Sequence, residues 1–166
     1  MKRGKSSTEV SEAIRHFIRS GELLPGMHIK QEDWARRLGV SRVPIREALG
    51  MLESEGLLLH EPHQGYSVAA PSESEVKQLY TLRRLMDREI ANHLVWPDQT
   101  AIAELRVVFD EAEKALSDGN IVQWLSCNDR FILNVYALCP LEIIVDQAMK
   151  LWHRTETVRA GRIRYE

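Results

Sequence analysis

The chain has 166 residues, of which 44% are hydrophobic and 28% charged, and its formal net charge is −2 at pH 7. This composition excludes a collagen-like, low-complexity or intrinsically disordered chain, and the net charge gives no general indication of a nucleic-acid partner. The most apolar stretch, residues 131–145, is interrupted by Asn134, Pro140 and Glu142, so no transmembrane helix is expected. The first residues lack the apolar centre of a signal peptide, and we expect a cytoplasmic protein that does not bind membranes.

Two helices are predicted at the start of the chain. Ser6 followed three residues later by Glu9 has the pattern of a capping box. Apolar residues then recur at helical spacing up to a stop at Gly21, namely Val10, Ile14, Phe17 and Ile18. A second, short helix is predicted over 31–38, ended by Gly39.

A third helix and a hairpin follow directly. Ser41 is a good N-cap and Pro44 is tolerated in the first helical turn. The apolar residues of this helix share one face, namely Ile45, Ala48, Leu49 and Leu52. After Gly56 the apolar residues alternate, with a turn over 61–65, which predicts a two-stranded hairpin. Three helices and a hairpin in this order predict a winged helix-turn-helix domain over residues 1–70.

Only helical periodicity is found beyond this point. Ser72 and Glu75 form a second capping-box pattern. Helices are predicted over residues 73–94, 99–117, 120–137 and 141–160. The predicted fold class is therefore mostly α, with an all-helical second domain over residues 71–166.

The third helix is the best candidate for a functional element. In a helix-turn-helix the second helix of the pair enters the major groove and presents its N-terminal residues to base edges. Arg42 lies at that end and Arg46 one turn further, and a guanidinium can donate two parallel bonds to guanine. Arg36, on the preceding helix, is expected to contact the DNA backbone. The alternative is that these are ordinary surface arginines, with Arg46 paired to Glu47 or Glu53.

The core of this region, residues 39–49, resembles the winged-helix domain of the GntR family of bacterial transcription regulators, with the match extending over about 8–70. The stretch at 79–94 resembles the first helix of the FadR-type ligand-binding domain, called FCD. The resemblance implies a dimer that binds double-stranded operator DNA. By position it implies DNA contacts at Ser41, Arg42, Val43, Arg46, Gln64 and Gly65.

The same resemblance bears on ligands of the second domain. It implies that Arg83 faces a small effector, plausibly a carboxylate, although a salt bridge to Asp87 explains Arg83 equally well. Many FCD domains bind a metal through an Asp-x-x-Phe-His pattern and two later histidines, but here Asn128 and Ile132 stand at the two ligand positions. Isoleucine cannot ligate a metal, so no metal or other cofactor is expected. The family domain continues beyond residue 166, and we expect the helical domain to lack its last helices.

These observations predict a sequence-specific DNA-binding transcription regulator, a repressor modulated by an effector. The alternatives are a winged-helix adaptor between proteins, or a DNA-binding fragment that responds to no effector. No nucleophile–base pair, phosphate-binding loop or paired-carboxylate motif indicates an enzyme.

Overall fold

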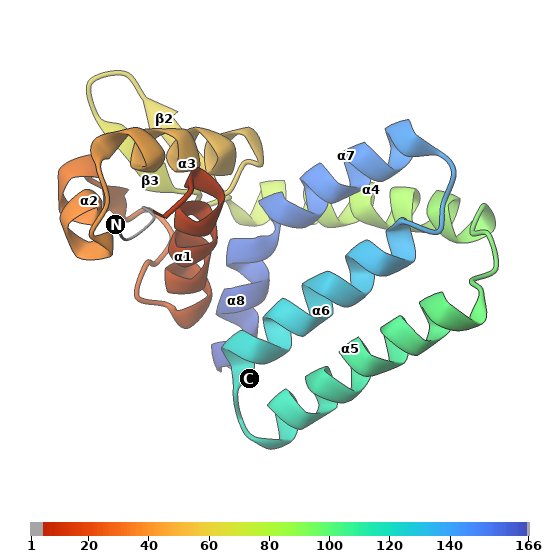
Figure 1. The fold of residues 1–166 in the computed structure, drawn as a ribbon. Coiled ribbons are helices and arrows are strands. Elements are labelled where there is room, and N and C mark those ends of the chain that lie inside the picture. The colour runs from red at the N-terminus through yellow and green to blue at the C-terminus, as the bar shows by residue number, and fades with distance from the viewer. Residues whose placement is uncertain (1–4, 166) are drawn as a thin grey trace. The chain divides into compact units, whose positions relative to one another are not determined.

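The computed structural model describes residues 5–165, with side chains up to residue 161 (Figure 1). Its contacts divide the chain into two units, one formed by residues up to 76 together with those from 153 onward, and the other by residues 77–152. This grouping differs from the expected boundaries of 1–70 and 71–166, because the segment after residue 152 packs with the N-terminal unit.

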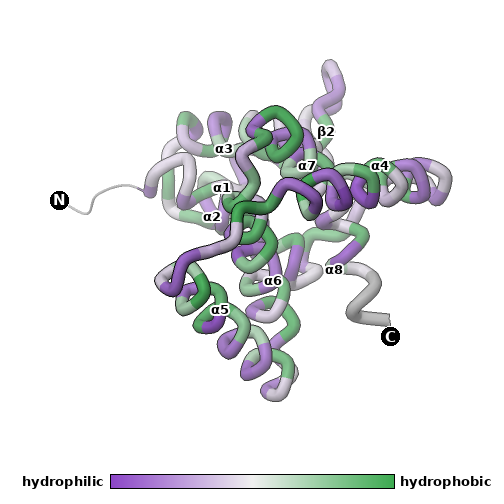
Figure 2. The backbone as a smooth tube through the Cα atoms, turned by 90° about the vertical axis from the view of Figure 1, so that its right-hand side faces the viewer, coloured by the Kyte–Doolittle hydropathy of each residue, from purple (hydrophilic) through white to green (hydrophobic). Residues whose placement is uncertain are grey.

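The first unit contains the predicted winged helix-turn-helix. Its elements are α1 (Ser7–Ser20), β1 (His28–Ile29), α2 (Gln31–Leu38), α3 (Arg42–Ser54), β2 (Leu58–Glu61), β3 (Gly65–Val68) and α8 (Glu156–Tyr165). The hydrophobic stripes predicted for α1 and α3 form its core, and Ile14, Ile45, Leu49 and Leu52 are completely buried. Figure 2 shows the corresponding alternation of hydrophobic and hydrophilic residues along the helices.

The ends of these helices follow the predicted signals with one difference. Ser6 caps α1 in a capping box with Glu9, and Gly39 ends α2 in the left-handed conformation at φ 68°. Ser41 is the N-cap of α3, as predicted, but its side chain makes no capping hydrogen bond. Its hydroxyl is therefore not committed to the backbone of its own helix.

The hairpin is confirmed and gains a third strand. The sheet has the antiparallel order β1-β3-β2, with Leu58 opposite Val68 and His28 opposite Ser67. The added strand β1 pairs with the edge of β3 that β2 leaves free. At the tip of the hairpin His63 has φ 66° and Gly65 has φ 82°, both in the left-handed region.

Helices are the only regular secondary structure among the described residues of the second unit. It comprises α5 (Gln99–Ser117), α6 (Ile121–Tyr136), most of α4 (Glu73–Asn92) and nearly all of α7 (Glu142–Arg154). Its core includes Ile90, Tyr136 and Ala148, and α5 and α6 pack side by side as an antiparallel pair. The prediction of a single helix over 141–160 is wrong, because a turn at Thr155 separates two helices. The side chain of Thr155 is completely buried. None of the helices within 5–165 has the length and apolarity needed to cross a membrane.

Candidate nucleic-acid interface

The face of α3 opposite its buried stripe is open to solvent. Ser41, Arg42 and Arg46 are exposed, and Val43 is 54% exposed. Helical periodicity directs Val43 and Arg46 away from the buried stripe of Ile45 and Leu49. Arg42 is exposed because it is the first residue of the helix. The helix thus presents two guanidinium groups and a hydroxyl near its N-terminus, where free backbone N–H groups also attract anions.

The guanidinium of Arg42 pairs with the carboxylate of Glu32 in α2. The two side chains are 70% and 62% exposed, so solvent screens the pair strongly. Sequence reasoning did not identify Glu32, because the pair connects two helices across a turn and no periodic pattern marks it. This acid limits the directions in which the guanidinium of Arg42 can point.

Arg46 makes no ion pair with any acid that the structure describes, so neither Glu47 nor Glu53 holds it. It lies close enough to β3 to affect Tyr66 electrostatically. Burial and the charge and hydrogen bonding of Glu53 raise the pKa of Tyr66, and the positive charge of Arg46 opposes that rise. The outer face of α3 and the hairpin are therefore parts of one surface.

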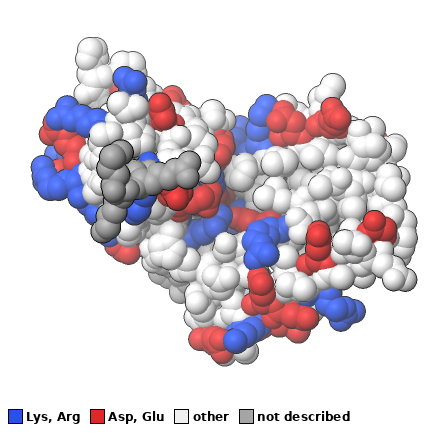
Figure 3. All heavy atoms as spheres, viewed as in Figure 1, with Lys and Arg blue, Asp and Glu red and all other residues white. Residues whose placement is uncertain are grey.

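The two other arginines of the basic stretch differ from each other. Arg36 is 79% exposed and lies 3.7 Å from Asp33, an arrangement that leaves it available to a phosphate. Arg37 stacks on the rings of Phe17 and Trp34, at 4.0 and 4.9 Å from the ring centroids, and pairs with Glu22. It covers the core rather than standing free. Figure 3 shows basic and acidic side chains close together over the α2 end of this unit.

The hairpin tip presents the predicted wing residues. Gln64 is exposed and Gly65 is half-buried, with open space where a Cβ would be. His63 adopts a backbone conformation that costs a residue other than glycine free energy, which is common at functional positions. The tip can therefore bring backbone and short polar groups close to a narrow groove.

Arg83 lies in the second unit on a pocket of about 200 Å³. Its guanidinium stacks on Trp152 at 4.2 Å and faces Tyr80 at 5.3 Å, measured to the ring centroids. The proposed salt bridge partner Asp87 lines the same pocket and accepts a hydrogen bond from Tyr136 Oη. The contact with Trp152 was not predictable from sequence, since Trp152 is on a different helix, whereas Tyr80 lies three residues before Arg83 on α4.

The positions compared with the family metal site have other uses here. Ile132 lines the Arg83 pocket with its apolar side chain. The neighbouring Asp129 is buried and accepts a hydrogen bond of 2.8 Å from Trp152 Nε1, so it supports the packing of α7. Within the described residues no group of three or more His, Cys, Asp or Glu side chains could hold a metal ion.

Comparison with known proteins agrees with this geometry. Residues 6–68 match the sequence model of the family "Bacterial regulatory proteins, gntR family". An uncharacterised HTH-type transcriptional regulator of Agrobacterium vitis is 28% identical over 123 residues, which is 72% of each chain. The HTH-type transcriptional regulator McbR of Escherichia coli is 27% identical over 93% of this chain and 70% of its own.

Solved structures show the same fold. "E. coli McbR/YncC" superposes with a TM-score of 0.71 at 24% identity, covering 93% of this chain and 74% of that chain. A putative GntR transcriptional regulator from Rhodococcus sp. RHA1 gives a TM-score of 0.73 at 24% identity and the same coverage. The matched family model describes bacterial regulatory proteins, and the matched relatives are named as transcriptional regulators.

Proposed function

We propose that this chain, a DNA-binding transcription regulator whose residues 6–68 form a gntR-family module, reads its operator through α3 and the hairpin tip. The observation that carries the proposal is the N-terminal end of α3, where Arg42 and Arg46 are exposed while Ile45 and Leu49 of the same helix are completely buried. In this reading Ser41, Arg42, Val43 and Arg46 contact the major groove, Gln64 and Gly65 contact the minor groove, and Arg36 contacts a phosphate. DNA as the ligand also implies a cytoplasmic location.

A carboxylate effector bound at Arg83 is the second part of the proposal. Trp152 and Tyr80 hold the guanidinium at the wall of a pocket whose lining is mostly apolar apart from Asp87 and Tyr136, which suits an anion with a hydrophobic body. Such a ligand changes operator binding only as far as it prefers one arrangement of the protein. We expect repression that the effector relieves.

A dimer is the third part. Large apolar side chains are exposed on α4 and α5 of the second unit, namely Leu82, Leu85, Ile102, Val107 and Phe109. Exposed apolar groups on this scale commonly mark a protein interface, and an operator of two half-sites calls for two copies of α3. We propose that no metal takes part, because Ile132 contributes only methyl and methylene groups to the pocket.

Binding of the full chain to duplexes selected from a random pool tests the DNA proposal. The affinity should fall steeply between about 50 and 200 mM salt, because contacts to phosphate gain free energy from the release of counterions from the DNA. Arg46→Ala should lower the affinity for the selected duplex by about 1–3 kcal/mol. Arg130→Ala is the matched control, since Arg130 is a half-exposed arginine of α6 paired with Glu111. If no duplex is selected, the DNA proposal is wrong. If Arg46→Ala binds the selected duplex as tightly as Arg130→Ala does, the assignment of α3 as the reading helix is wrong.

Mass spectrometry of the natively purified protein tests the effector proposal. A retained small acid that is lost in Arg83→Leu, whose apolar side chain keeps the pocket filled, supports it. A ligand retained equally by both proteins contradicts it, and elemental analysis of the same sample checks the prediction that no metal is bound.

A further inference from the structure

The segment from the end of α7 onward packs with the DNA-binding unit, where it contacts α1 and the turn that follows α3. α8 packs on α1, and the side chain of Arg154 lies over Gly56, directly after α3. A Cβ at Gly56 would be 2.5 Å from Arg154 Cγ, so this contact has no room for a larger residue. The C-terminal segment is therefore part of the packing around the reading helix.

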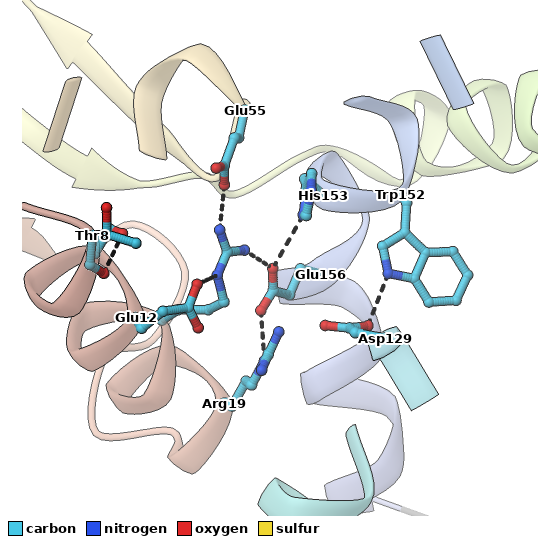
Figure 4. Close-up of polar contacts among 10 residues, drawn as sticks. Thr8, Glu12, Arg19, Glu55, Asp129, Trp152, His153 and Glu156 are labelled. Atoms are coloured by element: carbon cyan, nitrogen blue, oxygen red, sulfur yellow. Dashed lines mark hydrogen bonds and ion pairs between the residues drawn. The ribbon is translucent and has the colours of Figure 1, made fainter. Parts of the chain in front are cut away.

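A buried carboxylate forms the centre of this contact. Glu156 of α8 is 2% exposed, pairs with Arg15 and accepts a hydrogen bond of 2.7 Å from Arg19 Nε (Figure 4). His153 Nδ1 lies 4.0 Å from the same carboxylate. Both arginines belong to α1 and are themselves buried. A buried charge is tolerated only when it is paired in this way.

Electrostatics keep this carboxylate ionised. Burial alone would raise the pKa of Glu156, but the nearby His153 and the charges of Arg15, Arg19 and Arg159 lower it to about 2. At neutral pH the group is therefore an anion held between cations, and it cannot relax to a neutral form.

Arg15 extends this contact to the reading helix. Besides Glu156, its guanidinium pairs with Glu55, the C-cap residue of α3. One planar guanidinium thus bridges an acid of α8 and an acid at the end of α3, and this fork geometry makes arginine unsuited to replacement by lysine.

We infer that Glu156 is a positioning residue for the DNA-reading helix, and that it acts through Arg15 and Glu55. With Glu156 in place, Arg15 is fixed and holds the C-terminal end of α3 against α1. Without it, two buried cations face each other and α3 loses its fixed orientation. Base contacts by Arg42 and Arg46 depend on that orientation, whereas contacts to phosphate depend mainly on charge. This inference rests on the proposed role of α3.

The ratio of specific to non-specific DNA affinity, measured on the full chain, distinguishes this positioning role from a merely structural one. Affinities are measured at a temperature where circular dichroism shows every variant to be folded, for a duplex selected with the wild type and for a scrambled duplex. Glu156→Gln should weaken binding to the selected duplex at least tenfold and change binding to the scrambled one less than twofold. Glu12→Gln is the matched control, because Glu12 also pairs with Arg15, at 3.3 Å, but belongs to α1 and is exposed. It should change both affinities less than twofold.

Each outcome decides the question. A variant Glu156→Gln that melts earlier but keeps the wild-type ratio of specific to non-specific affinity overturns the inference. If this variant does not fold, Glu55→Gln replaces it, because Glu55 is partly exposed and its loss leaves Glu156 with both arginines. It should lower the same ratio, and an unchanged ratio overturns the inference. A wild type that selects no duplex instead refutes the proposed function.

Discussion

The ion pair between Glu32 and Arg42 predicts opposite effects of two substitutions. Glu32→Gln removes the acid that competes with DNA for Arg42, so it should tighten operator binding. Arg42→Ala removes the base-reading group itself, so it should weaken operator binding. Both residues lie at the surface, so neither substitution removes a buried contact.

The size of each effect follows from exposure. The pair is 70% and 62% exposed, and exposed pairs contribute about 0–1 kcal/mol. Freeing Arg42 can therefore strengthen binding by about fivefold at most. A bidentate contact to guanine contributes about 1–3 kcal/mol, so Arg42→Ala should weaken binding by about 5- to 150-fold. The ion pair is thus too weak to prevent Arg42 from reading a base.

Fluorescence anisotropy with a labelled duplex, at two salt concentrations, measures these changes. The gain from Glu32→Gln should shrink at high salt, since salt screens exposed charges. Asp33→Asn is the matched control, because Asp33 is an exposed acid of the same helix whose partner is Arg36. In the Arg42→Ala background Glu32→Gln should change the affinity no more than this control does. A Glu32→Gln effect that persists there shows that Glu32 acts on DNA without Arg42 and refutes the reasoning.

Two further predictions concern stability. The pKa of Glu156 is lowered from an ordinary value of 4.5 to about 2, so the unfolded chain binds a proton before the folded one does as the pH falls. Chemical denaturation should therefore show that the free energy of unfolding falls between about pH 4.5 and about pH 2. The free energy of unfolding of Glu156→Gln should depend less on pH over this range. Equal pH dependence in the two proteins would contradict the lowered pKa of Glu156. Asp129→Ala removes the acceptor of the 2.8 Å hydrogen bond from Trp152 Nε1. The free energy of unfolding, measured in urea, should fall by about 1–3 kcal/mol. A change below about 0.5 kcal/mol would show that water replaces the carboxylate.

The local structure of the first unit could be predicted from sequence because its signals are local. The Ser6–Glu9 capping box, the glycine after α2 and the apolar stripe of α3 each involve residues within about two helical turns of one another. Alternation identified the hairpin in the same way. The short strand β1 could not be predicted, because two residues pair only with a strand almost forty positions later.

Which charged groups meet was decided by tertiary structure alone. The sequence determined that Arg46 faces outward, because its spacing relative to the buried stripe places it on another side of the helix. It placed Arg42 at the exposed start of that helix, after the N-cap Ser41. It could not reveal that Glu32 pairs with Arg42, that Trp152 stacks on Arg83, or that Glu156 is buried against Arg15. Each of these contacts joins separate elements, and periodicity carries no information on how such elements pack. Burial then converts an ordinary surface residue type, such as the glutamate in α8, into a charge that must be paired.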